Sequence, residues 1–133
     1  MISLMYAHAV LMCCACLLLL SGALIARLAK QKKWWLATHR SVGITGAFVM
    51  AAGLCSMLLQ VYLTGRPHSA IPHSYVGFMV TGLGILTPIF GQLQLTVSSA
   101  RPKIRRLHIW FGRSTILLMI VNIIIGLSLI GIL

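Results

Sequence analysis

The stretch RPKIRRLHIWFGR, residues 101–113, joins a basic segment to an apolar one, with His108 at the junction and Gly112 four residues later. Apart from Arg105, Arg106, His108, Arg113 and a few polar residues, positions 104–132 are apolar. A helix needs roughly 20 such residues to cross a hydrocarbon core of about 30 Å. We therefore expect a membrane-spanning helix over 104–132. Ionisable side chains are rare in such helices and are usually functional, which makes His108 a candidate site residue.

Three more apolar segments precede this one, at 3–26, 36–63 and 72–97. Of the 133 residues, 59% are hydrophobic and 8% are charged, which is too apolar for an ordinary soluble domain of this size. The breaks between the segments are short, and short connections make consecutive helices antiparallel neighbours. The sequence predicts one all-α domain over 1–133, an integral membrane four-helix antiparallel bundle of up-down-up-down topology.

The charges predict how the bundle is oriented. The chain has eleven Lys and Arg residues and no Asp or Glu, and ten of the eleven lie around the first and third breaks: Arg27, Lys30, Lys32, Lys33 and Arg40, then Arg101, Lys103, Arg105, Arg106 and Arg113. By the positive-inside rule these loops are cytoplasmic and both termini are non-cytoplasmic. In a soluble protein this charge would suggest nucleic acid. Here we expect membrane lipid as the partner, with no nucleic acid.

Each predicted helix carries a histidine near its N-terminal end: His8 in HAVLM, His39 in HRSVG, His73 in HSYVG and His108 in HIWFG. In the predicted topology, the first and third helices begin at the outer side and the other two begin at the cytoplasmic side. The sequence therefore predicts an outer pair of His8 with His73 and a cytoplasmic pair of His39 with His108. Helix rise puts the two pairs roughly 20 Å apart along the membrane normal.

Three of these histidines are followed four residues later by a glycine, at Gly43, Gly77 and Gly112. Residues at this spacing share a helix face, so we expect the glycines to make room for a flat cofactor. Paired imidazoles with such clearance fit haem best, and iron with two axial histidines favours electron transfer over oxygen chemistry. Zinc and copper sites commonly use three or four ligands, and the chain has no Asp, Glu or suitably placed Cys to supply them.

These motifs resemble the cytochrome b561 transmembrane domain, especially the form found in ferric-chelate reductases and DOMON-linked proteins. The resemblance covers nearly the whole chain and rests on HAVLM, ALIAR, WWLATH, HSYVG, GQLQ and RPKIRRLHIWFGR, with Asn122 and Gly126. It implies a protein that binds two haem b groups, with His8, His39, His73 and His108 as axial ligands. Family members commonly have six helices, so the flanking helices are expected to be absent or replaced by a homodimer partner or a redox subunit.

The resemblance also suggests where substrates bind. Arg27, Lys30, Lys32 and Lys33 are similar to the basic cluster that receives the donor in ascorbate-using members, and the outer-side candidates are Arg66 and His68. We expect a multi-pass protein of the plasma or inner membrane that passes electrons from a cytoplasmic-side donor, ascorbate-like or a quinol, to an outer acceptor. Ferric chelate and a partner redox protein are the candidate acceptors.

Two other functions stay open at this point. The first is a haem-bearing membrane subunit of a quinol-linked oxidoreductase, in which Gln60, Gln92 or Gln94 faces a quinone, although hydrogen bonding between helices is the simpler role for these residues. The second is an anchoring subunit whose histidines hold a structural metal.

Overall fold

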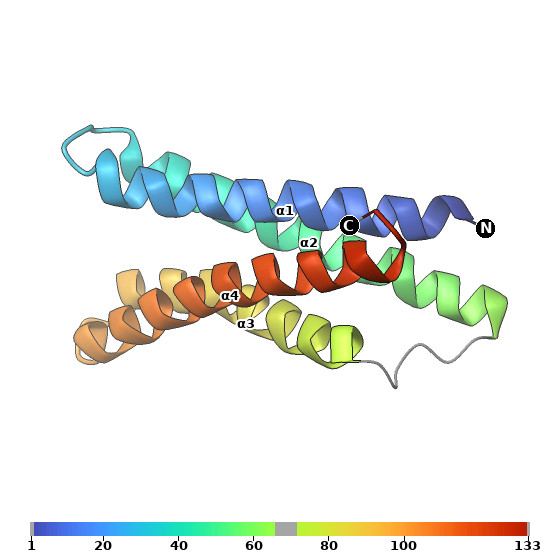
Figure 1. Cartoon of the computed structure of the whole chain (residues 1–133). Helices are drawn as coiled ribbons and strands as arrows, with labels where there is room; N and C mark the ends of the chain where they lie inside the picture. Colours follow the sequence, from blue (N-terminus) through green and yellow to red (C-terminus); the bar gives the residue numbers. More distant parts are fainter. Residues whose placement is uncertain (1, 66–71, 133) are drawn as a thin grey trace.

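The computed structural model describes residues 2–65 and 72–132, with side chains from Leu4 onward. These ranges form four helices and contain no strand: α1 is Ile2–Leu28, α2 is Trp35–Thr64, α3 is Pro72–Thr96 and α4 is Arg101–Leu129 (Figure 1). All four are long and apolar enough to cross a membrane. The predicted all-helical class and its four spans are confirmed.

The helix boundaries lie close to the predicted ones, and the largest differences are in α4. This helix runs from Arg101 to Leu129 rather than over 104–132, and the connection expected at 98–103 is shorter. Pro102 explains the early start, because it lies in the first turn, where its missing N–H removes no helical hydrogen bond. At its C-terminal end, α2 is capped by Gly65. This residue has a φ of 64°, a left-handed conformation that glycine adopts without strain.

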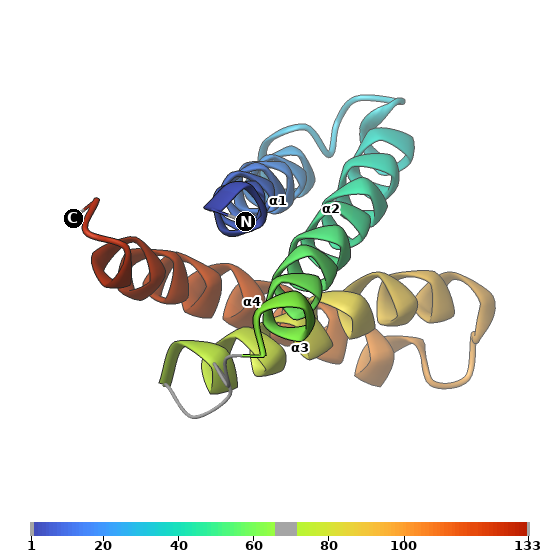
Figure 2. The ribbon, with the colours of Figure 1, turned by 90° about the vertical axis from the view of Figure 1, so that its right-hand side faces the viewer.

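The four helices form two hairpins. α1 packs chiefly on α2, and α3 packs chiefly on α4, while the contacts between the hairpins are sparser. Figure 1 shows α1 along the top of the bundle and α2 descending from the upper left to the lower right, and Figure 2 shows the two hairpins from the end that carries the N-terminus. We call the opposite end, with the connections at 29–34 and 97–100, the basic end. We call the interface between the two hairpins the seam. Because its contacts are sparser than those within each hairpin, it has room for a binding site.

The hydrophobic core lies midway along this seam and takes one buried side chain from each helix: Ala15, Met50, Val80 and Met119. Gly84 lets α3 approach α2 here, because an added Cβ would lie 3.1 Å from Met50 Sδ and would collide with its Cε. The buried hydroxyls of Thr81 and Thr115 donate to carbonyl oxygens of their own helices. The middle of the bundle is therefore closely packed, and it separates two ends.

The outward faces of the helices are apolar as well. Leu17, Phe48 and Leu117 are 64%, 73% and 64% exposed. Exposing so much apolar surface to water would cost free energy. A helix that is hydrophobic all round belongs in a protein core or in a membrane. These faces therefore suit contact with lipid.

Candidate functional site

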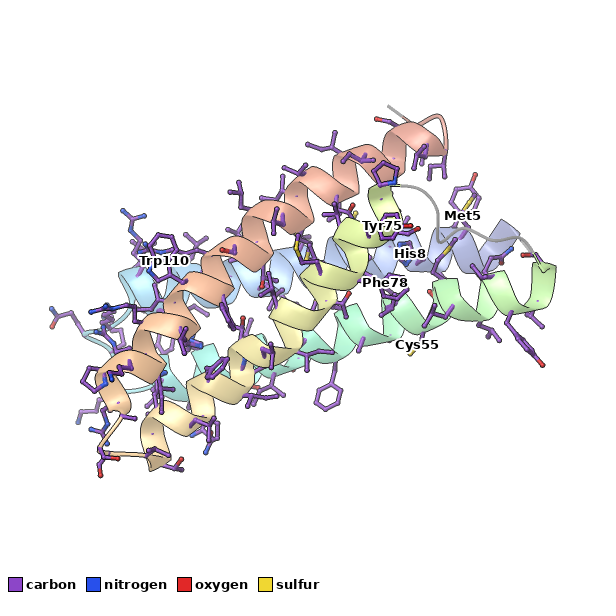
Figure 3. The ribbon with its side chains drawn as sticks, turned by 90° about the horizontal axis from the view of Figure 1, so that it is seen from below. Met5, His8, Cys55, Tyr75, Phe78 and Trp110 are labelled. Carbon is purple, nitrogen blue, oxygen red and sulfur yellow. The ribbon has the colours of Figure 1, made fainter. Side chains whose placement is uncertain are left out.

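The histidines of the four helices come together in two pairs. The ring centroids of His8 and His73 are 6.2 Å apart, and those of His39 and His108 are 5.9 Å apart. The rings within each pair are nearly perpendicular, at 85° and 88°. Each pair takes one ring from each hairpin. Figure 3 shows His8 toward one end of the bundle, on the same side as Met5, Tyr75 and Phe78, with Trp110 toward the basic end.

Each of the four rings is hydrogen bonded through Nδ1 to a backbone carbonyl oxygen of the other helix in its own hairpin. The distances are 2.8 Å for His8 to Gly53, 2.8 Å for His39 to Gly22, 3.1 Å for His73 to Asn122 and 2.8 Å for His108 to Thr87. A carbonyl oxygen can only accept, so each Nδ1 carries the proton and donates it. The lone pair of each ring is then on Nε2, which is the nitrogen available to a metal.

The acceptor carbonyls follow a regular spacing. In every helix the acceptor lies fourteen residues after the histidine of that same helix: His8 and Gly22, His39 and Gly53, His73 and Thr87, His108 and Asn122. Fourteen residues of helix span about 21 Å, so the two pairs lie at levels separated by about that distance. Sequence reasoning missed these acceptors because every residue has a carbonyl. The fourfold recurrence of the spacing becomes visible only once the partners are known.

Glycines of the facing helix contact two of the rings. An added Cβ at Gly126 would lie 2.7 Å from Cε1 of His73, and one at Gly91 would lie 3.0 Å from Cε1 of His108. Both glycines come four residues, or one helical turn, after the carbonyl that holds the ring. Neither glycine lies four residues after a histidine of its own helix, so the histidine motifs did not predict these ring contacts.

The three glycines that were predicted to make room for a cofactor lie in different surroundings. Gly77 lines the cavity described below, and its added Cβ would be 3.2 Å from Nδ2 of Asn122. At Gly112 the added Cβ would be 3.4 Å from Cγ2 of Thr87, and at Gly43 nothing lies within 4 Å. Their packing against haem stays a prediction.

A partly open cavity of about 710 Å³ is lined by residues of all four helices, with His8 and His73 among them. Its lining is mostly apolar, but it includes Gln60 and Asn122. The side-chain oxygens Gln60 Oε1 and Asn122 Oδ1 are buried and have no hydrogen-bond partner within the described part of the chain. Unpartnered buried polar atoms are costly. The cavity therefore suits a bulky, largely apolar ligand that also carries polar groups, as haem does.

The His39/His108 pair lies in different surroundings, at the basic end. The ring of Trp35 is 6.3 Å from that of His39, and Arg40 Nη2 donates to Gln92 Oε1 at 2.8 Å. This hydrogen bond joins α2 of one hairpin to α3 of the other. A recess of about 380 Å³ lies nearby on α4, lined by Pro102, Arg105, Arg106, Ile109 and Trp110. One pair thus lines a mostly apolar cavity, and the other lies at the end of the bundle that carries the basic residues.

Four of the six predicted substrate residues lie at the basic end, and the other two lie outside the described residues. Arg27, Lys30, Lys32 and Lys33 are exposed at the basic end, in the last turn of α1 and the connection after it. Arg66 and His68 lie outside the described residues.

The three glutamines differ in their contacts. Gln92 accepts from Arg40, and Gln94 Nε2 donates to the Gly91 carbonyl oxygen of its own helix. Of the three, Gln60 is the one that lines the cavity.

The spacing within each histidine pair would suit one metal-bearing group between the two imidazoles. Imidazole nitrogens bind first-row metals at about 2 Å, so two rings on opposite sides of one ion have centroids roughly 6 Å apart, as both pairs do. In residues 2–65 and 72–132, no three side chains of His, Cys, Asp or Glu gather in a way that could hold a metal ion. A tetrahedral structural metal site is therefore not supported in this part of the chain.

Four membrane-length helices that bring histidine pairs together define a multi-pass membrane protein of the cofactor-binding bundle class. The family model of eukaryotic cytochrome b561 matches residues 7–131, and the chain therefore belongs to the cytochrome b561 family. No curated protein and no solved structure matched the chain. The resemblance drawn from the motifs is confirmed. Membership implies haem b binding and transmembrane electron transfer, with lipid and electron donors and acceptors as partners.

Proposed function

We propose that this protein is a transmembrane electron conduit with two haem b sites, one at His8 and His73 and the other at His39 and His108. The observation that carries the proposal is the pair of centroid distances, 6.2 and 5.9 Å, between rings whose Nδ1 atoms are all held by carbonyl oxygens. When bound, haem iron supplies one-electron redox chemistry.

The residues of the two sites suit that chemistry. Each pair offers two neutral imidazoles, and the Nδ1 hydrogen bonds fix their orientation and increase the basicity of Nε2. If both histidines of a pair held the iron of one haem, no position would be left for oxygen, and the group would supply electron transfer. Around His8 and His73, the mostly apolar lining suits the porphyrin of a haem, while Asn122 and Gln60 offer polar groups to the edge of a ligand.

We further propose the orientation of the chain in the membrane. The basic end is placed in the cytoplasm by the positive-inside rule, which gives an up-down-up-down bundle with both termini outside, in the plasma or inner membrane. The donor, ascorbate-like or a quinol, then meets the cations Arg27, Lys30, Lys32 and Lys33. Electrons pass from the His39/His108 site to the His8/His73 site, and a ferric chelate or a partner redox protein accepts them outside.

A second candidate function is the haem-bearing membrane subunit of a quinol-linked oxidoreductase. One observation favours it: Gln60 Oε1 is buried, lines the cavity beside His8 and His73, and lacks a partner among the described residues. A quinol hydroxyl could donate a hydrogen bond to this oxygen.

Anaerobic reduction of the reconstituted protein, followed by absorption, tests both functions. Ascorbate, a quinol analogue and dithionite are added in turn, and haem is quantified against protein. We expect reduced b-type bands and two haems per chain. A purified protein without b-type bands, or one that binds a single haem, would contradict the proposal. Reduction by the quinol analogue but not by ascorbate would select the quinol-linked function.

The cations of the basic end are expected to raise the midpoint potential of the nearby haem. Ferric haem carries one more positive charge than ferrous haem, so a cation beside it disfavours the oxidised form. Arg40→Gln should therefore lower the midpoint potential at the His39/His108 site. The shift should be on the order of 20–70 mV, for one charge about 10 Å away in a medium of dielectric constant between roughly 20 and 80.

Spectroelectrochemical titration measures this shift, and Lys30→Gln is the matched control, because Lys30 is an exposed cation in the connection between α1 and α2. Both cations are exposed, but Arg40 is adjacent to His39 on α2, whereas Lys30 lies in the connection nine residues before it, so the control should move the potential less. A rise in potential after Arg40→Gln, or an equal shift at both haems, would contradict the expectation.

A further inference from the structure

Two glycines of the α3–α4 hairpin lie against histidine rings. We propose that Gly126 and Gly91 are positioning residues, which set the orientation of His73 and of His108 from the facing helix. Through these two rings, the α3–α4 hairpin sets the ligand orientation in both haem sites. The inference rests on the proposed function, and it assigns to two glycines a role that neither the histidine motifs nor the family match gives them.

The contacts of His73 show how a ring is held. Its Nδ1 donates to the carbonyl oxygen of Asn122 at 3.1 Å, and Gly126 follows Asn122 by one turn of α4. A Cβ added at Gly126 would lie 2.7 Å from Cε1, 3.2 Å from Nδ1 and 3.4 Å from Nε2 of that ring. Three atoms of the ring thus lie over the bare backbone. A carbonyl on one side and a helix surface on the other leave the ring little freedom to rotate.

His108 repeats the arrangement with the roles of the helices exchanged. Its Nδ1 donates to the carbonyl oxygen of Thr87 at 2.8 Å, and Gly91 follows Thr87 by one turn of α3. The added Cβ at Gly91 would lie 3.0 Å from Cε1, 3.1 Å from Nδ1 and 3.8 Å from Nε2. The same device therefore occurs once in each haem site.

The α1–α2 hairpin does not use this device. Residues one turn after its acceptor carbonyls are Ala26 and Met57 instead of glycines. The acceptor Gly22 stands near the ring of His39, but its added Cβ would be 3.8 Å from Nδ1, an ordinary contact. Each site thus joins one closely confined ring from α3–α4 to one less confined ring from α1–α2.

A methyl group at Gly126 would lie 2.7 Å from the ring of His73, which must then shift, and one at Gly91 would lie 3.0 Å from the ring of His108, which must give by a few tenths of an ångström. Such a shift is expected to weaken the hydrogen bond from Nδ1 to the carbonyl oxygen and to change the direction in which Nε2 points. Changes to the groups that orient a metal ligand typically cost about 10- to 100-fold in affinity. We expect a loss of this size in haem affinity, at one site only for each variant.

The test compares Gly126→Ala and Gly91→Ala with the control Gly82→Ala. Gly82 lies on α3, is exposed and has nothing within 4 Å of an added Cβ, so alanine there should be harmless or slightly stabilising. Electron paramagnetic resonance of the oxidised protein and the rate of haem transfer to apomyoglobin are measured. Gly126→Ala should alter the signal of the His8/His73 haem and speed its release, and Gly91→Ala should do so for the other haem.

A double variant separates positioning from damage to the fold. If Gly126 acts through His73, then Gly126→Ala added to His73→Ala should leave the remaining haem unchanged, because residues that act through one group are not additive. Loss of the second haem in the double variant would overturn the inference. So would unchanged signals in both glycine variants of a protein that binds two haems. A wild-type protein without haem would instead refute the proposed function itself.

Discussion

His73→Ala is expected to remove one haem and to leave the other in place. The variant keeps the fold of the α3–α4 hairpin but loses one Nε2 of the His8/His73 pair, and a single imidazole does not hold a six-coordinate haem b. The His39/His108 pair lies about 21 Å away along the helices and shares no ligand with it. Haem per chain, measured as the pyridine haemochromogen, should fall by about half. His39→Ala should give the same loss at the other site.

Two controls distinguish loss of a ligand from misfolding. Imidazole added during haem reconstitution can fill the space left by the ring and should restore the missing haem in His73→Ala. His68→Ala should keep both haems, because His68 belongs to neither pair. Loss of both haems in His73→Ala without recovery by imidazole, or retention of both, would contradict the assignment of the ligands.

Gly84→Leu is expected to lower the haem content of both sites together. Gly84 is buried where α3 crosses Met50 of α2, and an added Cβ would collide with Met50 Cε and lie 3.3 Å from Cγ2 of Thr115. Overpacking of a closely filled core costs about 1–3 kcal/mol. Because this contact lies on the seam, the hairpins should be pushed apart, and both pairs take one ring from each hairpin. A lower Tm and reduced haem at both sites are the expected results.

Gly82→Leu is the matched control for this variant. It places the same side chain two residues away, where nothing lies within 4 Å. Thermal unfolding in detergent and haem content should match the wild type. If the two leucine variants behaved alike, the effect would come from adding leucine to α3 and not from the contact with Met50.

Much of the fold could be predicted from the sequence because hydropathy and charge act over long segments. Twenty or more apolar residues in a row have few alternatives to a membrane helix, so all four spans were found. Pro102 was assigned to a connection because proline breaks helices, but in the first turn it is compatible with one. The ends of elements depend on single residues, and there the prediction was less accurate.

The histidine side chains of the candidate site could be predicted from the sequence, but the backbone groups that hold them could not. His8, His39, His73 and His108 stand out as ionisable groups in apolar segments, and alternating helix directions predict which of them meet. The carbonyls that hold these rings have no signature in the sequence. Clearance was sought on the histidine's own helix, at Gly77 and Gly112, whereas Gly126 and Gly91 face the rings from across the hairpin. Which faces of two helices meet depends on helix rotation, which an almost wholly apolar segment does not specify.

The fourteen-residue interval between histidine and acceptor sets the distance between the two ring levels in every helix. From histidine to acceptor the count is the same in all four helices, yet from acceptor to the next histidine it is seventeen residues in the first hairpin, Gly22 to His39, and twenty-one in the second, Thr87 to His108. The connection at 97–100 is nevertheless shorter than the one at 29–34, so the extra residues of the second interval belong to α3 and α4, which extend further toward the basic end than α1 and α2 do. The separation of the two ring levels is therefore set by an interval that is the same in all four helices, while the helix length beyond that interval differs between the hairpins.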